Sequence, residues 1–333
     1  MITASAPVRI CDNGGWTDTW FGGPGRVLNI AVTPGVDVSI RAAAGPDPII
    51  LDVAGVGDRY PVVPGASRVA RHPLLEAAID MLPPPPGQPV EVHVGSVVPP
   101  GSGTGTSAAV AVAVLGGLAA LRNEPLTRRR AAYAAHRLEV EVLGLESGIQ
   151  DQLCAAFGGI NYLRIDHYPE ATVHPLPAWD ELSPLLTLVF LGHAHDSSSV
   201  HRRVIEGAGG LGSDAFSRLR DAATAARDAV LARDLEAFGR SLVDNTEAQA
   251  LLHPDLVGRD CRRVIEVAAA ERALGWKVNG AGGDGGSITL LSGSAAEKAV
   301  LERRLYQMDA PFQVLPVQVS PTGLCVSGCV QDA

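Results

Sequence analysis

The chain has 333 residues, of which 46% are hydrophobic, and this is enough for two lobes with their own cores or for one large one. Its formal net charge of −9, without a block of five or six like charges, excludes a basic nucleic-acid groove and a surface for anionic membranes. No apolar h-region follows the N-terminus, so no signal peptide is expected and the chain is predicted to be cytoplasmic. Five cysteines, an odd number, argue against a disulfide framework.

Alternating apolar and polar residues predict strands over much of the first hundred residues. The predicted strand-like stretches cover residues 6–10, 26–42, 49–63 and 90–98, with a turn at Pro34 and Gly35 inside the second and glycine breaks inside the third. Between the last two strands, apolar residues that share one helical face predict a short helix over 72–82.

A polar loop, CDNGGWTDTWFGG, follows the first predicted strand. Gly14 and Gly15 permit a close approach of the backbone to a ligand. A carboxylate such as Asp18 beside the indole of Trp16 could hold a polyol through hydrogen bonds and stacking. The alternative is an Asx turn at Asp12 with a structural role for Asp18, and the loop by itself favours that alternative.

The stretch VPPGSGTGTSAAVAVAVLGGLAAL, residues 98–121, predicts a glycine-rich loop that runs into a buried helix. Its glycines let backbone N–H groups approach a ligand, and the helix start adds free N–H groups and the positive end of the helix dipole. These features are typical of an anion site, most often for phosphate, with a tight turn before a core helix as an equal alternative. The lysine of G-x-x-x-x-G-K-[ST] and the third glycine of the dinucleotide fingerprint are both absent.

Helices dominate the sequence that follows. Thr127 is the expected N-cap of a helix that runs to Leu143 and carries Glu139 and Glu141 near its end. Asp151 lies in a polar turn before a helix of small residues, where it could be a capping residue, a base or a cation ligand. The later predicted elements are a strand over 185–191, helices over 213–232, 234–250 and 257–274, a strand–glycine loop–strand over 276–291 and a strand over 312–319.

Four separated stretches resemble, in order, motifs of the GHMP sugar and metabolite kinases, which transfer the γ-phosphoryl group of ATP to small alcohols. APVRICDNGGWTDT is similar to the first family motif, PPGSGTGTSAA to the second, P-x-x-x-G-L-G-S-S-A-A, and VNGAGGDGGSITLL to the third. GIQDQ is similar to the segment that carries the catalytic aspartate in the sugar-kinase branch. The matches span nearly the whole chain, and their order and spacing make the resemblance specific.

The chain departs from these motifs at a few positions. Thr104 replaces the usual Leu, Thr106 replaces the usual first Ser, and Asp284 interrupts the glycines of the third motif. Asp12 and Asn13 stand where family members commonly have apolar or small residues. These differences bear on the substrate preference more than on the reaction.

The resemblance implies a role for each matching residue, with ATP and Mg²⁺ as the cofactors. Asp151 matches the catalytic base, Arg9 matches the residue that helps hold it, and Asp18 matches the residue that binds a sugar hydroxyl. For Mg²⁺, the matches are the hydroxyl of Ser107 and the carboxylate of Glu139, with Glu141 as a near alternative. The other matches are substrate-binding residues (Gly14, Gly15, Trp16, Thr17, Gln152) and nucleotide-binding residues (Pro100, Gly101, Ser102, Gly103, Thr104, Gly105, Thr106, Ser107, Gly282, Gly283).

The resemblance also implies an α+β fold with two lobes. A ribosomal protein S5-like N-terminal lobe would cover residues 1–165, and a ferredoxin-like C-terminal lobe would cover residues 166–333. GGWTDT, GRVLNIAV and the QDQ…FGG segment are most similar to fucokinases and to heptose 7-phosphate and octose 8-phosphate 1-kinases. We therefore expect an ATP-dependent kinase for the anomeric C1 hydroxyl of a heptose or octose phosphate, in a nucleotide-sugar pathway such as those of antibiotic biosynthesis.

The expected partner is a small-molecule sugar or sugar phosphate, and a homodimer is a further expectation. A free-sugar kinase acting on fucose or galactose is the alternative among enzymes, and a sugar- and ATP-binding sensor without turnover is the alternative of another class. A phosphorylated sugar needs cations, for which Arg26, Arg202 and Arg203 are the candidates, although solvated surface arginines are the simpler interpretation.

Overall fold

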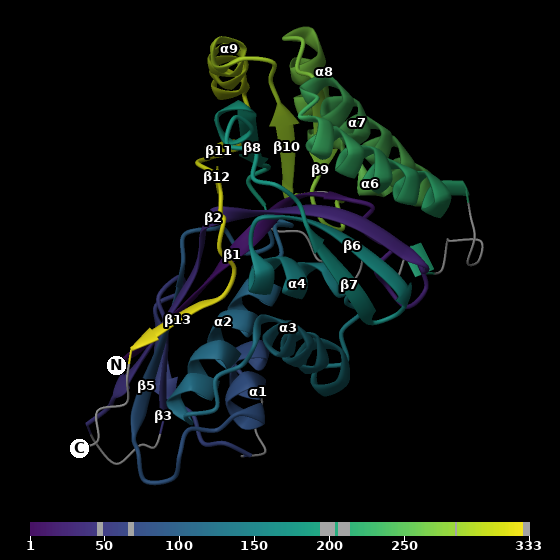
Figure 1. Cartoon of the computed structure of the whole chain (residues 1–333). Helices are drawn as coiled ribbons and strands as arrows, with labels where there is room; N and C mark the ends of the chain where they lie inside the picture. Colours follow the sequence, from purple (N-terminus) through teal and green to yellow (C-terminus); the bar gives the residue numbers. More distant parts are fainter. Residues whose placement is uncertain (45–48, 66–69, 194–203, 206–213, 284, 329–333) are drawn as a thin grey trace.

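The computed structural model describes residues 1–44, 49–65, 70–193, 204–205, 214–283 and 285–328. Within these residues the strands form two sheets in an α+β arrangement (Figure 1). The strands of the nine-stranded sheet are Ile2–Asn13 (β1), Gly25–Ala42 (β2), Ile49–Val53 (β3), Asp58–Pro61 (β4), Val90–Ser96 (β5), Ile160–His167 (β6), Glu170–Pro175 (β7), Gln318–Val319 (β12) and Cys325–Gly328 (β13). The strands of the four-stranded sheet are Leu186–Phe190 (β8), Gly275–Val278 (β9), Ser287–Leu291 (β10) and Gln313–Leu315 (β11).

The helices come in two groups along the chain. The α-helices of the first half are Pro73–Met81 (α1), Thr106–Leu121 (α2), Arg128–Arg137 (α3) and Gln150–Phe157 (α4). Those of the second half are Asp214–Ala232 (α6), Leu235–Leu252 (α7), Arg259–Ala270 (α8) and Ala295–Tyr306 (α9). A π-helical turn, Leu138–Val142 (η1), and two 3₁₀ turns, Ser183–Leu185 (η2) and Pro254–Leu256 (η3), complete the set.

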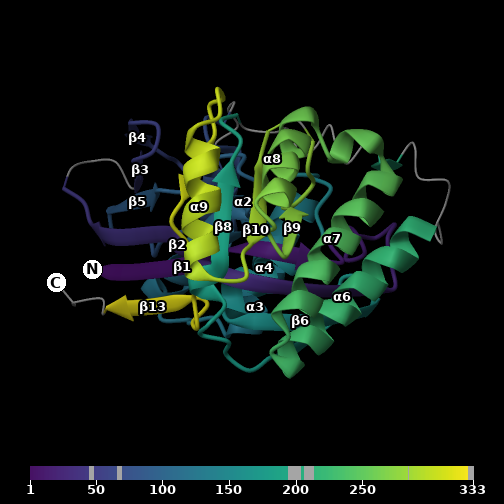
Figure 2. The ribbon, with the colours of Figure 1, turned by 90° about the horizontal axis from the view of Figure 1, so that it is seen from above.

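The long strands β1 and β2 form the centre of the molecule. The large sheet has the order β13-β1-β2-β5-β3-β4, and β6 and β7 extend it because β2 is long enough to pair with β6 along residues 25–30 and with β5 along residues 36–42. Helices α2 and α4 pack on one face of β1 and β2, and α6 packs on the other face (Figure 1). The small sheet, in the order β11-β8-β10-β9, lies on the α6 side (Figure 2).

The helices predicted from apolar spacing and caps are confirmed to within a few residues. Thr127 caps α3 by accepting a hydrogen bond from the backbone N–H of Arg130, at 3.3 Å. The predicted continuation to Leu143 differs in form, because the chain widens into the π-helical turn η1 after α3. The apolar helix α2 is buried along most of its length, as expected for a helix without a polar face.

Two strand predictions are wrong. β2 runs through Pro34 and Gly35 without a turn, because a shift in its register with β1 opposite Ala6 leaves these residues out of the ladder. The predicted strand over 312–319 is divided at Pro316, and its halves, β11 and β12, join different sheets.

The β6–β7 hairpin, helix α9, strand β13 and the two 3₁₀ turns were not predicted. β13 pairs with β1, so a segment from the C-terminal end of the chain completes the sheet that begins at the N-terminus. β7, β12 and β13 all follow residue 165 and belong to the nine-stranded sheet. The division into two lobes between residues 165 and 166 stays a prediction.

None of the helices among the described residues is long and apolar enough to cross a membrane.

Candidate active site

The glycine-rich loop before α2 has the geometry of an anion-binding loop. Gly101, Gly103 and Gly105 have φ values of +68°, +73° and +69°, a left-handed conformation that favours glycine. Within the described residues, no side chain caps the start of α2 at Thr106, so the first-turn N–H groups are available to a ligand. The buried hydroxyls of Ser102 and Thr104 lie 2.7 Å apart and hold the loop from inside.

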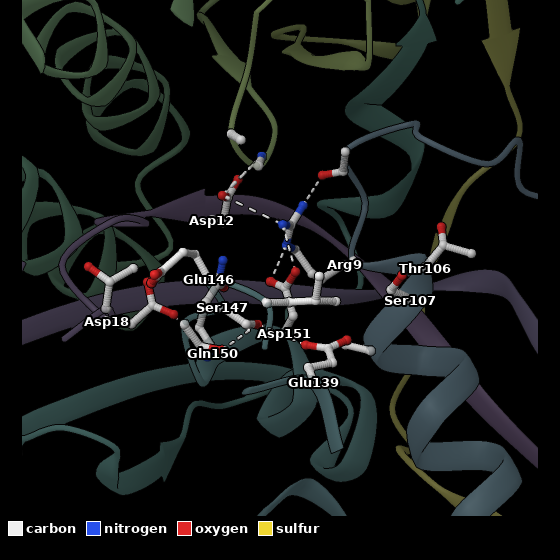
Figure 3. A pocket seen from close by; sticks show the side chains of 18 of the residues that line it. Arg9, Asp12, Asp18, Thr106, Ser107, Glu139, Glu146, Ser147, Gln150 and Asp151 are labelled. Atoms are coloured by element: carbon white, nitrogen blue, oxygen red, sulfur yellow. Dashed lines mark hydrogen bonds and ion pairs between the residues drawn. The ribbon is translucent and has the colours of Figure 1, made fainter. Parts of the chain in front are cut away.

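A cavity of about 350 Å³ lies beside this loop. Its walls come from the end of β1, the loop 101–107, the turn η1, the start of α4 and the loop between β9 and β10. Figure 3 shows Asp151 in the middle of these side chains, with Arg9 on one side of its carboxylate and Glu139 on the other. In the same view, Asp18 and Glu146 lie to the left of Asp151, and Thr106 and Ser107 lie to its right.

Arg9 and Asp151 form a two-pronged ion pair. Arg9 Nε donates to Asp151 Oδ1 at 2.8 Å, Arg9 Nη2 donates to Asp151 Oδ2 at 3.0 Å, and Arg9 Nη1 donates to the carbonyl oxygen of Gly103. Burial lowers the pKa of Arg9, but the negative charges of Asp151 and Asp12 outweigh burial and raise it above its ordinary value. Arg9 is therefore charged, and its hydrogen bonds tie the carboxylate of Asp151 on α4 to the glycine loop.

Gly105 brings the glycine loop against this ion pair. A Cβ atom at position 105 would lie 3.0 Å from Asp151 Oδ2 and 3.3 Å from Arg9 Cγ. Together with the positive φ of Gly105, this close approach leaves no room for a side chain between the loop and the carboxylate.

Glu139 points into the cavity from the π-helical turn. Its Oε2 accepts hydrogen bonds from Ser147 Oγ at 2.8 Å and from Gln152 Nε2 at 2.5 Å. Burial raises the pKa of Glu139 to about 7. Glu141 is exposed and does not line the cavity, so the structure brings together Glu139, and not Glu141, with Asp151. The extra residue of a π-turn redirects the side chains of a helix in this way.

Asp18 occupies the side of the cavity away from the glycine loop. It is buried beside Trp16, and Oδ2 accepts a hydrogen bond from the backbone N–H of Gln150 at 3.0 Å. At the cavity rim, Trp20 Nε1 donates to Glu146 Oε2 at 2.6 Å. Burial raises the pKa of Asp18 to about 7, and the charge of Asp151 adds to the rise.

This pKa predicts how the stability of the ligand-free protein depends on pH. Between its ordinary pKa of 3.8 and about 7, Asp18 binds a proton in the folded protein and releases it in the unfolded chain. Stability conferred by the protonated form is therefore lost as the pH rises through this window. We expect the melting temperature to fall more between pH 5 and pH 8 for the wild type than for Asp18→Asn. Asp228→Asn, on an exposed part of α6, is the control that should retain the wild-type decline, and equal declines in all three proteins would contradict the assignment.

Some predicted site residues support the cavity without lining it. Thr17 Oγ1 donates to the carbonyl oxygen of Gly14 and thereby holds the turn that carries Asp18, and Gln152 supports Glu139. Gly283 N donates to the carbonyl oxygen of Leu256. The predicted residues outside the cavity lining are Gly14, Gly15, Thr17, Pro100, Thr104, Gln152, Gly282 and Gly283.

Several polar residues that line the cavity were not predicted as site residues, namely Asp12, Thr19, Glu146, Ser147 and Gln150, and neither was Lys277 beside it. Asp12 was assigned to an Asx turn, but its carboxylate is buried and lies 3.1 Å from Lys277 Nζ. One feature of the sequence could have identified Lys277 as a site residue. The chain contains only two lysines, and Lys277 lies inside a predicted strand next to the third glycine motif. Buried lysines are rare unless they are paired.

Of the candidate cations for a sugar phosphate, Arg26 is among the described residues, and it does not line the cavity. Arg26 Nη2 lies 3.0 Å from Asp166 Oδ1, and Arg26 Nη1 donates to the carbonyl oxygen of Gly25. Arg202 and Arg203 lie outside the described residues, as does Asp284 of the third motif.

Residues 68–159 match the sequence profile described as the GHMP kinases N terminal domain. D-glycero-alpha-D-manno-heptose 7-phosphate kinase of Campylobacter jejuni is 27% identical over 204 residues, which are 58% of this chain and 59% of that protein. The bifunctional fucokinase/GDP-fucose pyrophosphorylase of Arabidopsis thaliana is 26% identical over 336 residues, which cover 92% of this chain and 31% of that protein. The chain thus spans less than two thirds of the length of either relative.

Solved structures of GHMP kinases share the fold. A D-glycero-D-manno-heptose 1-phosphate kinase from Bacteriodes thetaiotaomicron superposes with a TM-score of 0.78 at 22% identity, over 99% of this chain and 100% of that one. A mevalonate kinase superposes with a TM-score of 0.75 at 15% identity, over 96% and 99% of the two chains. The expected two-lobed α+β fold is therefore confirmed.

Proposed function

We propose that this chain, which carries a GHMP kinase N-terminal domain in the two-lobed fold of such kinases, is an ATP-dependent sugar kinase. One observation carries the proposal: the Arg9–Asp151 ion pair stands between an uncapped, glycine-lined helix start and a buried polar recess around Asp18. The first of these fits the phosphates of a nucleotide, and the second fits the hydroxyl groups of a sugar.

In the proposed reaction, a hydroxyl group of the sugar lies against the carboxylate of Asp151. The proton of that hydroxyl passes to Asp151, the hydroxyl oxygen bonds to the γ-phosphorus of ATP, and the bond to the β–γ bridging oxygen breaks, so that ADP leaves. Positioning and charge stabilisation dominate catalysis of phosphoryl transfer. The hydrogen bonds from Arg9 contribute to positioning, because they orient the Asp151 carboxylate.

The residues at the cavity fit the predicted Mg²⁺. Glu139 is a buried carboxylate that meets only hydrogen-bond donors in its described contacts, and its raised pKa reflects an unfavourable charge that a cation would stabilise. Ser107, in the first turn of α2, supplies a hydroxyl that also lines the cavity. Mg²⁺ is often held by one carboxylate, water and the phosphates of a substrate, and when bound it neutralises charge on the transferring phosphoryl group.

For the acceptor, we propose the anomeric C1 hydroxyl of a heptose or octose phosphate in a nucleotide-sugar pathway. The support is the resemblance of the first and QDQ segments, together with the name of the Campylobacter jejuni relative. Arg9 is the one cationic side chain among the described residues that line the cavity, and Asp151 already neutralises it. The phosphate of such a sugar would therefore lie beyond the cavity wall that the described residues form, and Arg26, Arg202 and Arg203 are the candidates to bind it.

The test is ADP release from Mg-ATP with a panel of acceptors, followed by ³¹P NMR of the product. The panel contains heptose 7-phosphates, octose 8-phosphates, fucose, galactose and mevalonate. Turnover confined to the phosphorylated sugars, with a new anomeric phosphate signal, is the expected result. Turnover with fucose or galactose would replace the proposal with the free-sugar kinase. Binding of ATP without turnover on any acceptor would favour the sensor.

A further inference from the structure

We infer that the buried Asp12–Lys277 ion pair is a positioning pair that keeps the guanidinium of Arg9 on Asp151. The expected effect on kcat rests on the proposed kinase function. The expected effect on the position of Arg9 rests on the contacts alone. Asp12 and Lys277 are 265 residues apart in the sequence, and each is exposed by only 1%. Because burying an ion pair contributes little net stability, stability does not explain why this pair lies beside the cavity.

A backbone irregularity brings Asp12 next to Arg9. In a regular strand, residues 9 and 12 would point to opposite faces. Cys11, however, has a φ of +52°, and the register between β1 and β2 shifts between Ile10 and Asn13. As a result, Asp12 Oδ2 lies 4.0 Å from Arg9 Nη2. A left-handed conformation is strained for a residue other than glycine, and such strain gathers at functional positions.

Asp12 and Lys277 connect Arg9 to the elements on the α6 side of β1. Lys277 Nζ lies 3.1 Å from Asp12 Oδ1 and 3.3 Å from Gln249 Oε1 of α7, and it also donates to the carbonyl oxygen of Val278. Gln249, Lys277, Asp12, Arg9 and Asp151 thus form one continuous chain of polar contacts from α7 through β9 and β1 to α4.

Asp12 and Gln249, the two side-chain partners of Lys277, hold the third glycine loop against Arg9. Asp12 accepts hydrogen bonds from the backbone N–H of Gly280 at 3.0 and 3.2 Å, while Gln249 Nε2 donates to the carbonyl oxygen of Gly280 at 3.1 Å. A Cβ atom at position 280 would lie 2.7 Å from the carbonyl oxygen of Gly103 and 3.2 Å from Arg9 Nη2. The two glycine loops therefore meet at the guanidinium of Arg9.

The charges explain why Lys277 matters for the carboxylate of Asp151. Two cations, Arg9 and Lys277, face two anions, Asp12 and Asp151, so each carboxylate has its own cation. Without Lys277, Asp12 would be a buried anion, and among the described residues Arg9 would be the one cation paired with it. Arg9 Nη2 would then move toward Asp12 and release Asp151 Oδ2.

The test uses Lys277→Met, Asp12→Asn and the double variant, with Lys298→Met as the control. Lys298 is the only other lysine and pairs with Glu302 on α9, outside the cavity lining. We expect Lys277→Met to lower kcat about 10- to 100-fold, with KM for ATP changed much less, because the reacting groups are misplaced. The double variant restores the charge balance and should recover most of the lost kcat, while Lys298→Met should leave kcat unchanged. A double variant that is as slow as, or slower than, Lys277→Met would overturn the inference, because a merely structural role gives additive losses.

A second measurement does not depend on kinase activity. Hydrogen exchange of the Arg9 Nε–H group can be followed by ¹⁵N NMR, with the signal assigned by its loss in Arg9→Lys. We expect slow exchange in the wild type and in the double variant, and at least tenfold faster exchange in Lys277→Met. If the wild type phosphorylates no acceptor, the proposed function fails while this measurement still decides the positioning role. Equal exchange in the wild type and Lys277→Met would contradict it.

Discussion

Asp151→Asn is expected to lower kcat by about 10²–10⁴-fold while the affinity for ATP stays near that of the wild type. The amide fills the same space and can still accept a hydrogen bond from Arg9, but it cannot take a proton from the acceptor hydroxyl. The N–H groups of the glycine loop, which would meet the nucleotide phosphates, are unaltered by the substitution. Coupled ADP release gives kcat, and isothermal titration calorimetry gives the affinity for ATP.

Asp52→Asn is the matched control for this prediction. Asp52 is also a paired aspartate, since it bonds to His93 Nδ1 at 2.9 Å, but it does not line the cavity. Its substitution should leave kcat unchanged. Near-wild-type turnover of Asp151→Asn would show that Asp151 is not the base, whereas a parallel loss of ATP affinity would point to a role in the nucleotide site.

Arg9→Met should affect both stability and turnover. The side chain of Arg9 is 5% exposed and that of Asp151 is 26% exposed, so removal of the cation leaves a largely buried carboxylate without its partner. Breaking such a pair costs about 3–5 kcal/mol when it is fully buried, and we expect about 2–3 kcal/mol here because water reaches Asp151. We also expect kcat to fall at least about 100-fold, since Asp151 loses both bonds that orient it.

Arg9→Lys separates the charge from the geometry. Lysine retains the positive charge but cannot form two parallel hydrogen bonds. The free energy of unfolding of Arg9→Lys should therefore stay closer to its wild-type value than kcat stays to its own. Arg218→Met is the control, because Arg218 pairs with Asp214 on the exposed surface of α6 and should change the free energy of unfolding by at most about 1 kcal/mol. Urea unfolding of the four proteins gives these free energies, and an Arg9→Met protein as stable as Arg218→Met would refute the prediction.

The elements of the site that depend on consecutive residues could be predicted. The glycine-rich loop and the start of the buried helix at Thr106 follow from local composition, because glycine permits positive φ and an apolar run propagates as a helix. Thr127 could be placed as a cap for the same reason, since its hydroxyl bonds to an N–H group only three residues away. The resemblance of four motifs placed Arg9 and Asp151 in one site, and the structure shows their contact.

Elements whose sequence pattern is weak could not be predicted in this way. Helix α9 buries only Leu301 and Leu305, so its apolar face is too narrow to stand out. Strand β13 is exposed along its length and is defined by its pairing with β1, more than 300 residues earlier in the chain. The partners of Asp12 were missed because a carboxylate in a glycine-rich loop has a sufficient local explanation as a turn residue.

By itself, the sequence determined the position of the phosphate-type loop, most helices and the set of polar residues available for chemistry, because these depend on neighbours within a few positions. Only the tertiary structure decided which carboxylate meets which cation. The irregularity at Cys11 turns Asp12 toward Arg9, the π-helical turn brings Glu139 rather than Glu141 to the cavity, and the two sheets bring Lys277 to Asp12. The first two of these outcomes depend on a shift of one residue in register or helical pitch. Such a shift changes the direction of a side chain without changing the hydrophobic pattern from which strands and helices are predicted.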